Sequence, residues 1–180
     1  GFNAGSDLPA LHAGSPEIRH DMGLSMADAV ARLGAVDHVS VGLSDFGKPE
    51  GFLERQVPRW LAELESYNNF DNYPGPDIGD VSTVATWLEQ NTPKSWTPGI
   101  MHGDYHAANV MFSPTGPDVV AIVDWEMCTI GDPLVDLGWM LATWHQPGHD
   151  AVLNNVLMDA GNLATPTELI DRYAQNSTRD

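Results

Sequence analysis

Cysteine is nearly absent from this chain, because Cys128 is the only one among 180 residues. A single cysteine cannot form an internal disulfide, which argues against a disulfide-stapled scaffold of the secreted type. The sequence also lacks a long apolar run and a charged-then-apolar leader, so it predicts neither a membrane span nor a secretion signal. Together these absences predict a soluble, cytoplasmic protein.

Basic residues are scarce as well. The chain has 8 lysines and arginines against 25 acidic residues, which gives a formal net charge of -17. Such a charge repels polyanions, so nucleic acid and anionic membrane surfaces are not expected as main partners. Charge alone leaves the oligomeric state open.

The length of the chain allows one sizeable core, so residues 1–180 are interpreted as a single domain or lobe. Apolar side chains recur at three-to-four spacing in several segments, which is typical of amphipathic helices. The predicted helices cover residues 25–33, 52–64, 167–174 and a segment that follows Asp80 as N-cap and ends before Pro93.

Other segments complete the helical part. Residues 1–20 have no sustained periodicity and are predicted to form an extended segment and a loop. Trp60 and Trp87 fall at helical spacing among apolar neighbours, so both are expected to pack in the core. The pair Asp132-Pro133 predicts another helix start, with Asp as N-cap and Pro in the first turn. Its expected buried face consists of Leu134, Leu137, Gly138 and Leu141.

The periodicity changes near residue 100. Short β-type runs cover residues 100–101, 110–112 and 119–123. The last two are separated by Ser-Pro-Thr-Gly-Pro-Asp, a composition that predicts a hairpin connection. The expected fold class is therefore α+β, mainly α, with short β-hairpins.

Three polar side chains stand at the ends of these runs. Asp104 precedes Asn109 by five positions in a predicted loop, and Asp124 follows an apolar strand. Transfer of a phosphoryl group from ATP needs a carboxylate to orient the attacking hydroxyl and oxygen ligands to hold Mg²⁺. Asp104 suits the first task, and Asn109 and Asp124 suit the second.

Two stretches carry a family resemblance. His102-Gly103-Asp104 with Asn109 resembles the catalytic loop of the aminoglycoside phosphotransferase and choline kinase superfamily, which is itself similar to protein kinases. The run from Ile122 to Trp139 is most similar to the branch of kinase-like domains fused to acyl-CoA dehydrogenases. The resemblance implies a kinase-like C-terminal lobe and a phosphotransferase that uses ATP and Mg²⁺ and has an alcohol group as acceptor.

The resemblance also implies a role for each matching residue. Asp104 is expected to be the catalytic base, and Asn109 and Asp124 are expected to be the magnesium ligands, with Asn109 also near the nucleotide. His102 is expected to support the loop. Asp136 resembles the helix carboxylate that accepts hydrogen bonds from the backbone of the catalytic loop.

The sequence departs from protein kinases in ways that favour a small-molecule acceptor. Gly103 replaces the arginine that reads a phosphorylated activation loop, and Trp125-Glu126 replaces Phe-Gly. Its acceptor stays open between an aminoglycoside, a choline-like amine, a hydroxyacyl compound and another hydroxylated metabolite. Asp132 is interpreted as structural, and the role of Glu126 stays open between a place beside the metal and the surface.

The parts that hold ATP phosphates from above are missing from the sequence. It has no Gly-rich phosphate loop, and its two lysines, Lys48 and Lys94, stand in loop contexts. Residues 1–5 resemble the hinge between the two kinase lobes, which places Phe2 and Asn3 near the adenine. The chain is therefore expected to be a C-terminal lobe without its N-terminal ATP-binding lobe, and ATP binding by this chain alone stays open.

Two alternatives remain. A metal-dependent hydrolase would use His102, Asp104 and His106, which share a face if they lie on a strand, with Asp124 completing a site for zinc or manganese. Further ligands in that interpretation are His145 and His149. A non-catalytic binding module derived from a kinase is the second alternative.

Overall fold

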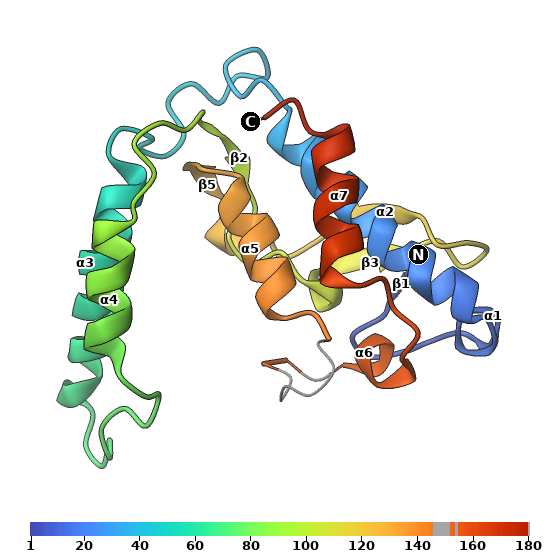
Figure 1. Ribbon diagram of the computed structural model, residues 1–180, viewed down its shortest axis with the longest axis horizontal. Coiled ribbons are helices and arrows are strands. Elements are labelled where there is room, and N and C mark those ends of the chain that lie inside the picture. Colours follow the sequence, from blue (N-terminus) through green and yellow to red (C-terminus); the bar gives the residue numbers. More distant parts are fainter. Residues whose placement is uncertain (146–151, 154, 180) are drawn as a thin grey trace.

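The computed structural model describes residues 1–145, 152, 153 and 155–179. Its centre is the long helix α2 (Pro16–Gly34), against which α7 (Pro166–Asn176) packs over much of its length (Figure 1). The Arg172 guanidinium of α7 donates two hydrogen bonds to the Asp28 carboxylate of α2, at 2.8 and 2.7 Å. The predicted helix over residues 167–174 is thereby confirmed and extended by a few residues.

The N-terminal region is more helical than the sequence predicts. Residues Ala10–Gly14 form the short helix α1, and α2 begins at Pro16, with the Ser15 hydroxyl accepting a hydrogen bond from the Ile18 N–H at 3.3 Å. The extended segment predicted at the start of residues 1–20 corresponds to strand β1 (Phe2–Asn3), but the loop predicted after it was wrong. Arg19 is buried and donates hydrogen bonds to backbone carbonyls. This charged residue occupies a core position, so it interrupts the apolar periodicity from which a helix would be predicted.

Two small antiparallel sheets lie beside these helices. One has the order β1 (Phe2–Asn3), β3 (Val110–Phe112) and β4 (Val119–Ile122), and the other pairs β2 (Gly99–Met101) with β5 (Thr129–Gly131). The β3–β4 hairpin is confirmed, closed by the Ser113 N–H donating to the Asp118 carbonyl at 2.8 Å.

Helices α3 (Phe52–Ser66) and α4 (Val81–Gln90), joined through the short helix η1 (Tyr67–Asn69), stand away from the rest of the molecule (Figure 1). Asp80 caps α4 as predicted, because its carboxylate accepts the Thr83 N–H at 3.0 Å. Trp60 is 50% exposed and Trp87 is 60% exposed, so the expected core packing of these indoles was wrong. Helix α3 packs on α4 and η1, and this pairing leaves both indoles largely exposed.

The remaining short elements are η2 (Ala107–Asn109), η3 (Trp125–Met127), α5 (Leu134–Ala142) and α6 (Val156–Ala160). Helix α5 follows Asp132-Pro133 as predicted, but its N-cap is Pro133 rather than Asp132. The Asp132 carboxylate accepts the Leu134 N–H at 3.1 Å. Its predicted buried face was partly wrong, because Leu134 is 41% exposed. The buried positions are Asp136, Leu137 and Met140. Each described helix is too short or too polar to cross a lipid bilayer.

The core reaches from α2 and α7 into the segment that follows β2. Tyr105 is fully buried, and its hydroxyl donates to the Met26 carbonyl of α2 at 2.9 Å. Burial also raises the pKa of Tyr105, so its hydroxyl stays a neutral donor. The loop that carries Asp104 is thus anchored in the hydrophobic core.

Replacing Leu169 by alanine tests the packing of α7. Leu169 belongs to the buried core, so Leu169→Ala leaves a cavity and is expected to lower the free energy of unfolding by about 2–5 kcal/mol. Urea denaturation followed by circular dichroism measures this change. The next residue, Ile170, is exposed on the same helix, and Ile170→Ala is expected to cost less than about 0.5 kcal/mol. Equal losses in the two variants would contradict this placement of α7.

Candidate active site

Residues 102–109 form the catalytic loop between β2 and β3, which is irregular up to His106 and ends in the short helix η2. Gly103 has a φ of 87°, a backbone conformation that side chains with a Cβ rarely adopt. A Cβ at this position would also collide with the backbone carbonyl of Met127. Glycine is therefore required, because the loop passes directly against the end of η3.

His102 is buried at the start of this loop. Its Nε2 lies 2.8 Å from the Val123 carbonyl oxygen, and its Nδ1 accepts the Asp104 N–H at 3.3 Å. This pattern places the ring proton on Nε2. The imidazole thereby joins the end of β4 to the backbone of Asp104, and its edge packs on Trp125 at 4.9 Å between ring centroids.

Asp136, in the first turn of α5, holds the same loop from the other side. Its two carboxylate oxygens accept the backbone N–H groups of His102 and Gly103, at 2.6 and 2.8 Å. Burial raises the pKa of Asp136, while these hydrogen bonds act in the opposite direction. Satisfied on both oxygens, the carboxylate fixes the loop backbone immediately before Asp104.

Two N–H groups donate hydrogen bonds to the Asp104 carboxylate, and an imidazole lies beside it. The Trp139 indole donates to Oδ1 at 2.7 Å, and the Asn109 carboxamide donates to Oδ2 at 3.0 Å. His106 Nε2 lies 3.3 Å from the same Oδ2. Asn109 also donates to the Asp104 backbone carbonyl at 2.9 Å, so the two predicted site residues are in direct contact.

Asp124 lies on the neighbouring segment. The Val123 N–H donates to the Asn109 carbonyl at 2.9 Å, and Asp124 follows directly in a left-handed conformation with a φ of 67°. Its carboxylate is exposed. Both side-chain hydrogen bonds of Asn109 that the described structure contains are donated by its nitrogen, which leaves its oxygen to face a cation. Oxygen donors of this kind fit Mg²⁺.

Glu126 does not extend the strand that Asp124 follows. A place for Glu126 beside the metal, one of the two roles left open, would need β4 to continue past Asp124, but the chain turns into η3 at Trp125. Glu126 instead lines a separate cavity, described below.

The proposed hinge residues lie at the edge of the three-stranded sheet. Phe2 packs on Phe112 and His12, with ring centroids 6.0 and 4.6 Å apart. The Asn3 side chain donates to the Ala108 carbonyl, so β1 is joined to the catalytic loop. Contacts of Phe2 and Asn3 with a nucleotide stay a prediction.

The hydrolase alternative receives no support from this geometry. Residues 102–106 are not a strand, so their side chains do not alternate on one face, and both ring nitrogens of His102 are engaged. Among the described residues no three His, Cys, Asp or Glu side chains come together as metal ligands. His145 is exposed, and His149 lies outside the described residues.

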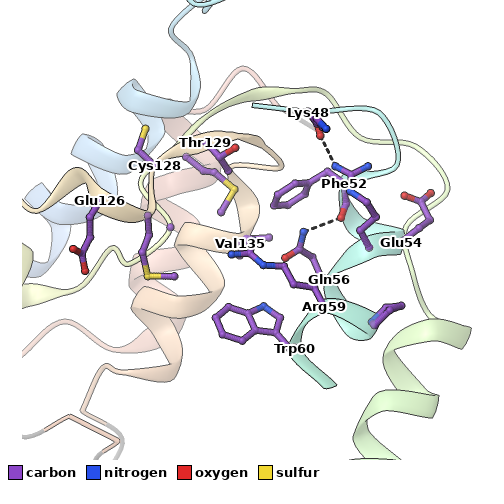
Figure 2. Close-up of a pocket in the computed structure, with 15 residues that line it drawn as sticks. Lys48, Phe52, Glu54, Gln56, Arg59, Trp60, Glu126, Cys128, Thr129 and Val135 are labelled. Carbon is purple, nitrogen blue, oxygen red and sulfur yellow. Dashed lines mark hydrogen bonds between the residues drawn. The ribbon is translucent and has the colours of Figure 1, made fainter. Parts of the chain in front are cut away.

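A cavity of about 880 Å³ separates the catalytic loop from α3 (Figure 2). Three of the chain's eight basic residues line it, together with two acids: Lys48, Arg55, Arg59, Glu54 and Glu126. In Figure 2 the side chains of α3 occupy one wall, and Glu126, Cys128 and Thr129 occupy the other. Gly103 also borders this cavity, which therefore opens beside the residue preceding Asp104.

Sequence reasoning missed two contributors to the site. Trp139 donates a hydrogen bond to the Asp104 carboxylate, and Arg59 belongs to the cavity wall. One signal for Trp139 was present, since it stands three residues after Asp136 and thus on the same face of the predicted helix. Arg59 gave no such signal, because its neighbours across the cavity are distant in sequence.

Comparison with known proteins places this site in a family. Residues 2–171 match the model described as the phosphotransferase enzyme family. Acyl-CoA dehydrogenase family member 11 from Gallus gallus is 31% identical over 153 residues, which is 82% of this chain and 19% of that protein. These matches confirm the resemblance seen in the motifs. The chain spans less than a quarter of the length of the curated relatives it matches.

Solved structures of phosphotransferases have a similar fold. A protein from Ralstonia eutropha assigned as an aminoglycoside phosphotransferase aligns with a TM-score of 0.73 and 28% identity, covering 99% of this chain and 52% of that one. Macrolide 2'-phosphotransferase type I aligns with a TM-score of 0.64 and 16% identity, covering 99% of this chain and 53% of that one, which shows a shared fold. The predicted fold class is thereby confirmed.

The Asp136 clamp can be tested by amide substitution. Asp136→Asn keeps the shape but offers only one acceptor oxygen to two N–H groups, so we expect the free energy of unfolding to fall by about 1–3 kcal/mol. Asp132→Asn is the matched control, because Asp132 accepts one backbone hydrogen bond and its amide oxygen can still do so. Thermal and urea unfolding measure the free energy of unfolding of both variants. An equal loss in Asp132→Asn would contradict the special role of the two hydrogen bonds to Asp136.

Proposed function

Because the chain belongs to the phosphotransferase enzyme family, we propose that it supplies the catalytic loop of an enzyme that moves the γ-phosphoryl group of ATP to a hydroxyl of a small molecule. The observation that carries this proposal is the placement of Asp104. Its carboxylate is held by N–H donors on both oxygens and touches Asn109, beside the segment that bears Asp124.

Each residue has a defined task in this proposal. Asp104 orients the acceptor hydroxyl and receives its proton, while Asn109 and Asp124 provide oxygen ligands for the cation. Mg²⁺, when bound, neutralises charge on the phosphate groups. Phosphoryl transfer passes through a loose transition state, so the protein contributes mainly position and electrostatics. His102 and Asp136 contribute by keeping the loop backbone in place.

The nucleotide is proposed to lie against β1, with the backbone of Phe2 and Asn3 near the adenine. The Asn3 side chain donates a hydrogen bond to the Ala108 carbonyl, so a nucleotide bound at β1 would lie next to a strand that is hydrogen-bonded to the catalytic loop. The Ralstonia structure is about twice as long as the region matched here, and we propose that an N-terminal ATP-binding lobe completes the cleft. Activity is therefore best measured with the full-length protein.

The acceptor is proposed to enter the cavity between the catalytic loop and α3. Lys48 and Arg59 form no ion pair with a carboxylate among the described residues, so their charge is available to a ligand. This lining suits a hydroxylated metabolite that carries negative charge better than it suits a polycationic aminoglycoside. A hydroxyacyl compound fits this description, and the curated relatives are named as acyl-CoA dehydrogenase family members.

Replacing the base is the direct test of the reaction. In the full-length protein, Asp104→Asn is expected to lower kcat for phosphate transfer by about 100-fold or more, because the amide cannot accept the hydroxyl proton. ATP consumption is followed with a panel of hydroxylated metabolites and aminoglycosides. Asp77→Asn, in an exposed loop, is the control. Turnover near the wild-type value in Asp104→Asn would overturn the assignment, and an inactive wild type that still binds ATP and Mg²⁺ would favour a binding module.

Charge reversal tests the acceptor site. Arg59→Glu is expected to raise KM for a negatively charged acceptor by about tenfold and to leave KM for ATP unchanged, because only the cavity wall is altered. Lys94→Glu makes the same change in net charge at an exposed position outside the cavity and is expected to leave both constants unchanged. Equal effects of the two variants would show that net charge, rather than the cavity, governs the acceptor.

A further inference from the structure

The two oxygens of the Asp104 carboxylate have different surroundings. Oδ2 accepts a hydrogen bond from the Asn109 carboxamide at 3.0 Å, and His106 Nε2 lies 3.3 Å from the same oxygen. Oδ1 accepts one hydrogen bond, from the Trp139 indole at 2.7 Å. A carboxylate oxygen can accept about two hydrogen bonds, so Oδ1, which no imidazole flanks, has room for a further donor.

The direction of the His106 contact follows from its other nitrogen. Nδ1 accepts the Ala108 N–H at 3.2 Å, so the ring proton is on Nε2, the nitrogen that lies 3.3 Å from Asp104 Oδ2. Rotation of the Asp104 carboxylate about its Cβ–Cγ bond would break hydrogen bonds on both sides at once. Both oxygens are thereby held in fixed places.

We propose that Trp139 is a positioning residue, whose indole N–H holds Asp104 Oδ1 so that its remaining lone pair meets the acceptor hydroxyl. This proposal rests on the proposed function and adds the identity of the proton-accepting oxygen. Trp139 itself does not exchange a proton with the substrate. The acceptor O–H donates to Oδ1, and its proton moves to that oxygen as the new O–P bond forms. At the same time the bond between the γ-phosphorus and the bridging oxygen of ATP breaks, and ADP leaves.

Helix α5, which carries the Trp139 indole, is fixed by buried side chains and by hydrogen bonds to the catalytic loop. Asp136 lies one turn earlier on the same helix and binds the loop backbone, and Leu137 and Met140 beside Trp139 are buried. The same short helix thus sets the backbone of the catalytic loop and the direction of its carboxylate. Phosphoryl transfer depends strongly on such alignment.

Removing only the indole N–H tests the proposal. In the full-length protein, Trp139→Phe keeps an aromatic ring and is expected to lower kcat about tenfold, with KM for ATP unchanged. Trp139→His restores a ring N–H donor and is expected to recover part of the loss, which a purely structural role would not predict.

Trp144 provides a matched control. Its indole donates a hydrogen bond of the same 2.7 Å length, but to the Ala164 carbonyl in the core. Trp144→Phe is expected to lower the Tm without changing kcat. A kcat in Trp139→Phe within twofold of wild type, or an equal fall in Trp144→Phe, would overturn the proposal.

A spectroscopic measurement separates this proposal from the proposed function. In protein labelled with ¹⁵N-tryptophan, the Trp139 indole N–H signal is expected to shift and to exchange faster with solvent in Asp104→Ala, while the Trp144 signal is unchanged. An unchanged Trp139 signal would remove the contact on which the proposal stands. A wild-type protein that transfers no phosphate would refute the function, and the shift would then report a contact without a catalytic role.

Discussion

The hydrogen bonds from the His102 and Gly103 backbone to the Asp136 carboxylate connect the core to the catalytic loop. Removing a carboxylate from water is costly unless its oxygens are satisfied, and here two N–H groups satisfy them. The same bonds fix a backbone turn that only Gly103 can adopt next to Met127. A single buried acid therefore fixes the backbone of the catalytic loop immediately before Asp104.

Helix α5 extends this control from the backbone to the side chain. Asp136 and Trp139 stand three residues apart, so they face the same loop from successive turns. On the opposite side, His102 binds the end of β4, and the Val123 N–H binds the Asn109 carbonyl. Hydrogen bonds thus link Asp104 to Asn109, and Asn109 to the segment that carries Asp124.

The sequence predicted those features that local chemistry determines. The capping of α4 by Asp80 and the β3–β4 hairpin each depend on residues that are close in sequence, and both are as predicted. The start of α2 was missed because buried Arg19 satisfies its charge with distant carbonyls, such as that of Gly161. The exposure of Trp60 was missed because periodicity identifies an apolar face but not the element that covers it. Contacts between distant segments set each of these outcomes.

The net charge of the chain differs from the local charge of the cavity beside the catalytic loop. The net charge of -17 suggests a preference for cations, yet Lys48, Arg55 and Arg59 meet in one cavity beside the catalytic loop. At physiological salt, charges farther away than about 8 Å are largely screened at the surface. An acceptor in the cavity therefore responds to the side chains that it touches far more than to scattered surface acids. Overall acidity and selection of a negatively charged acceptor are compatible for this reason.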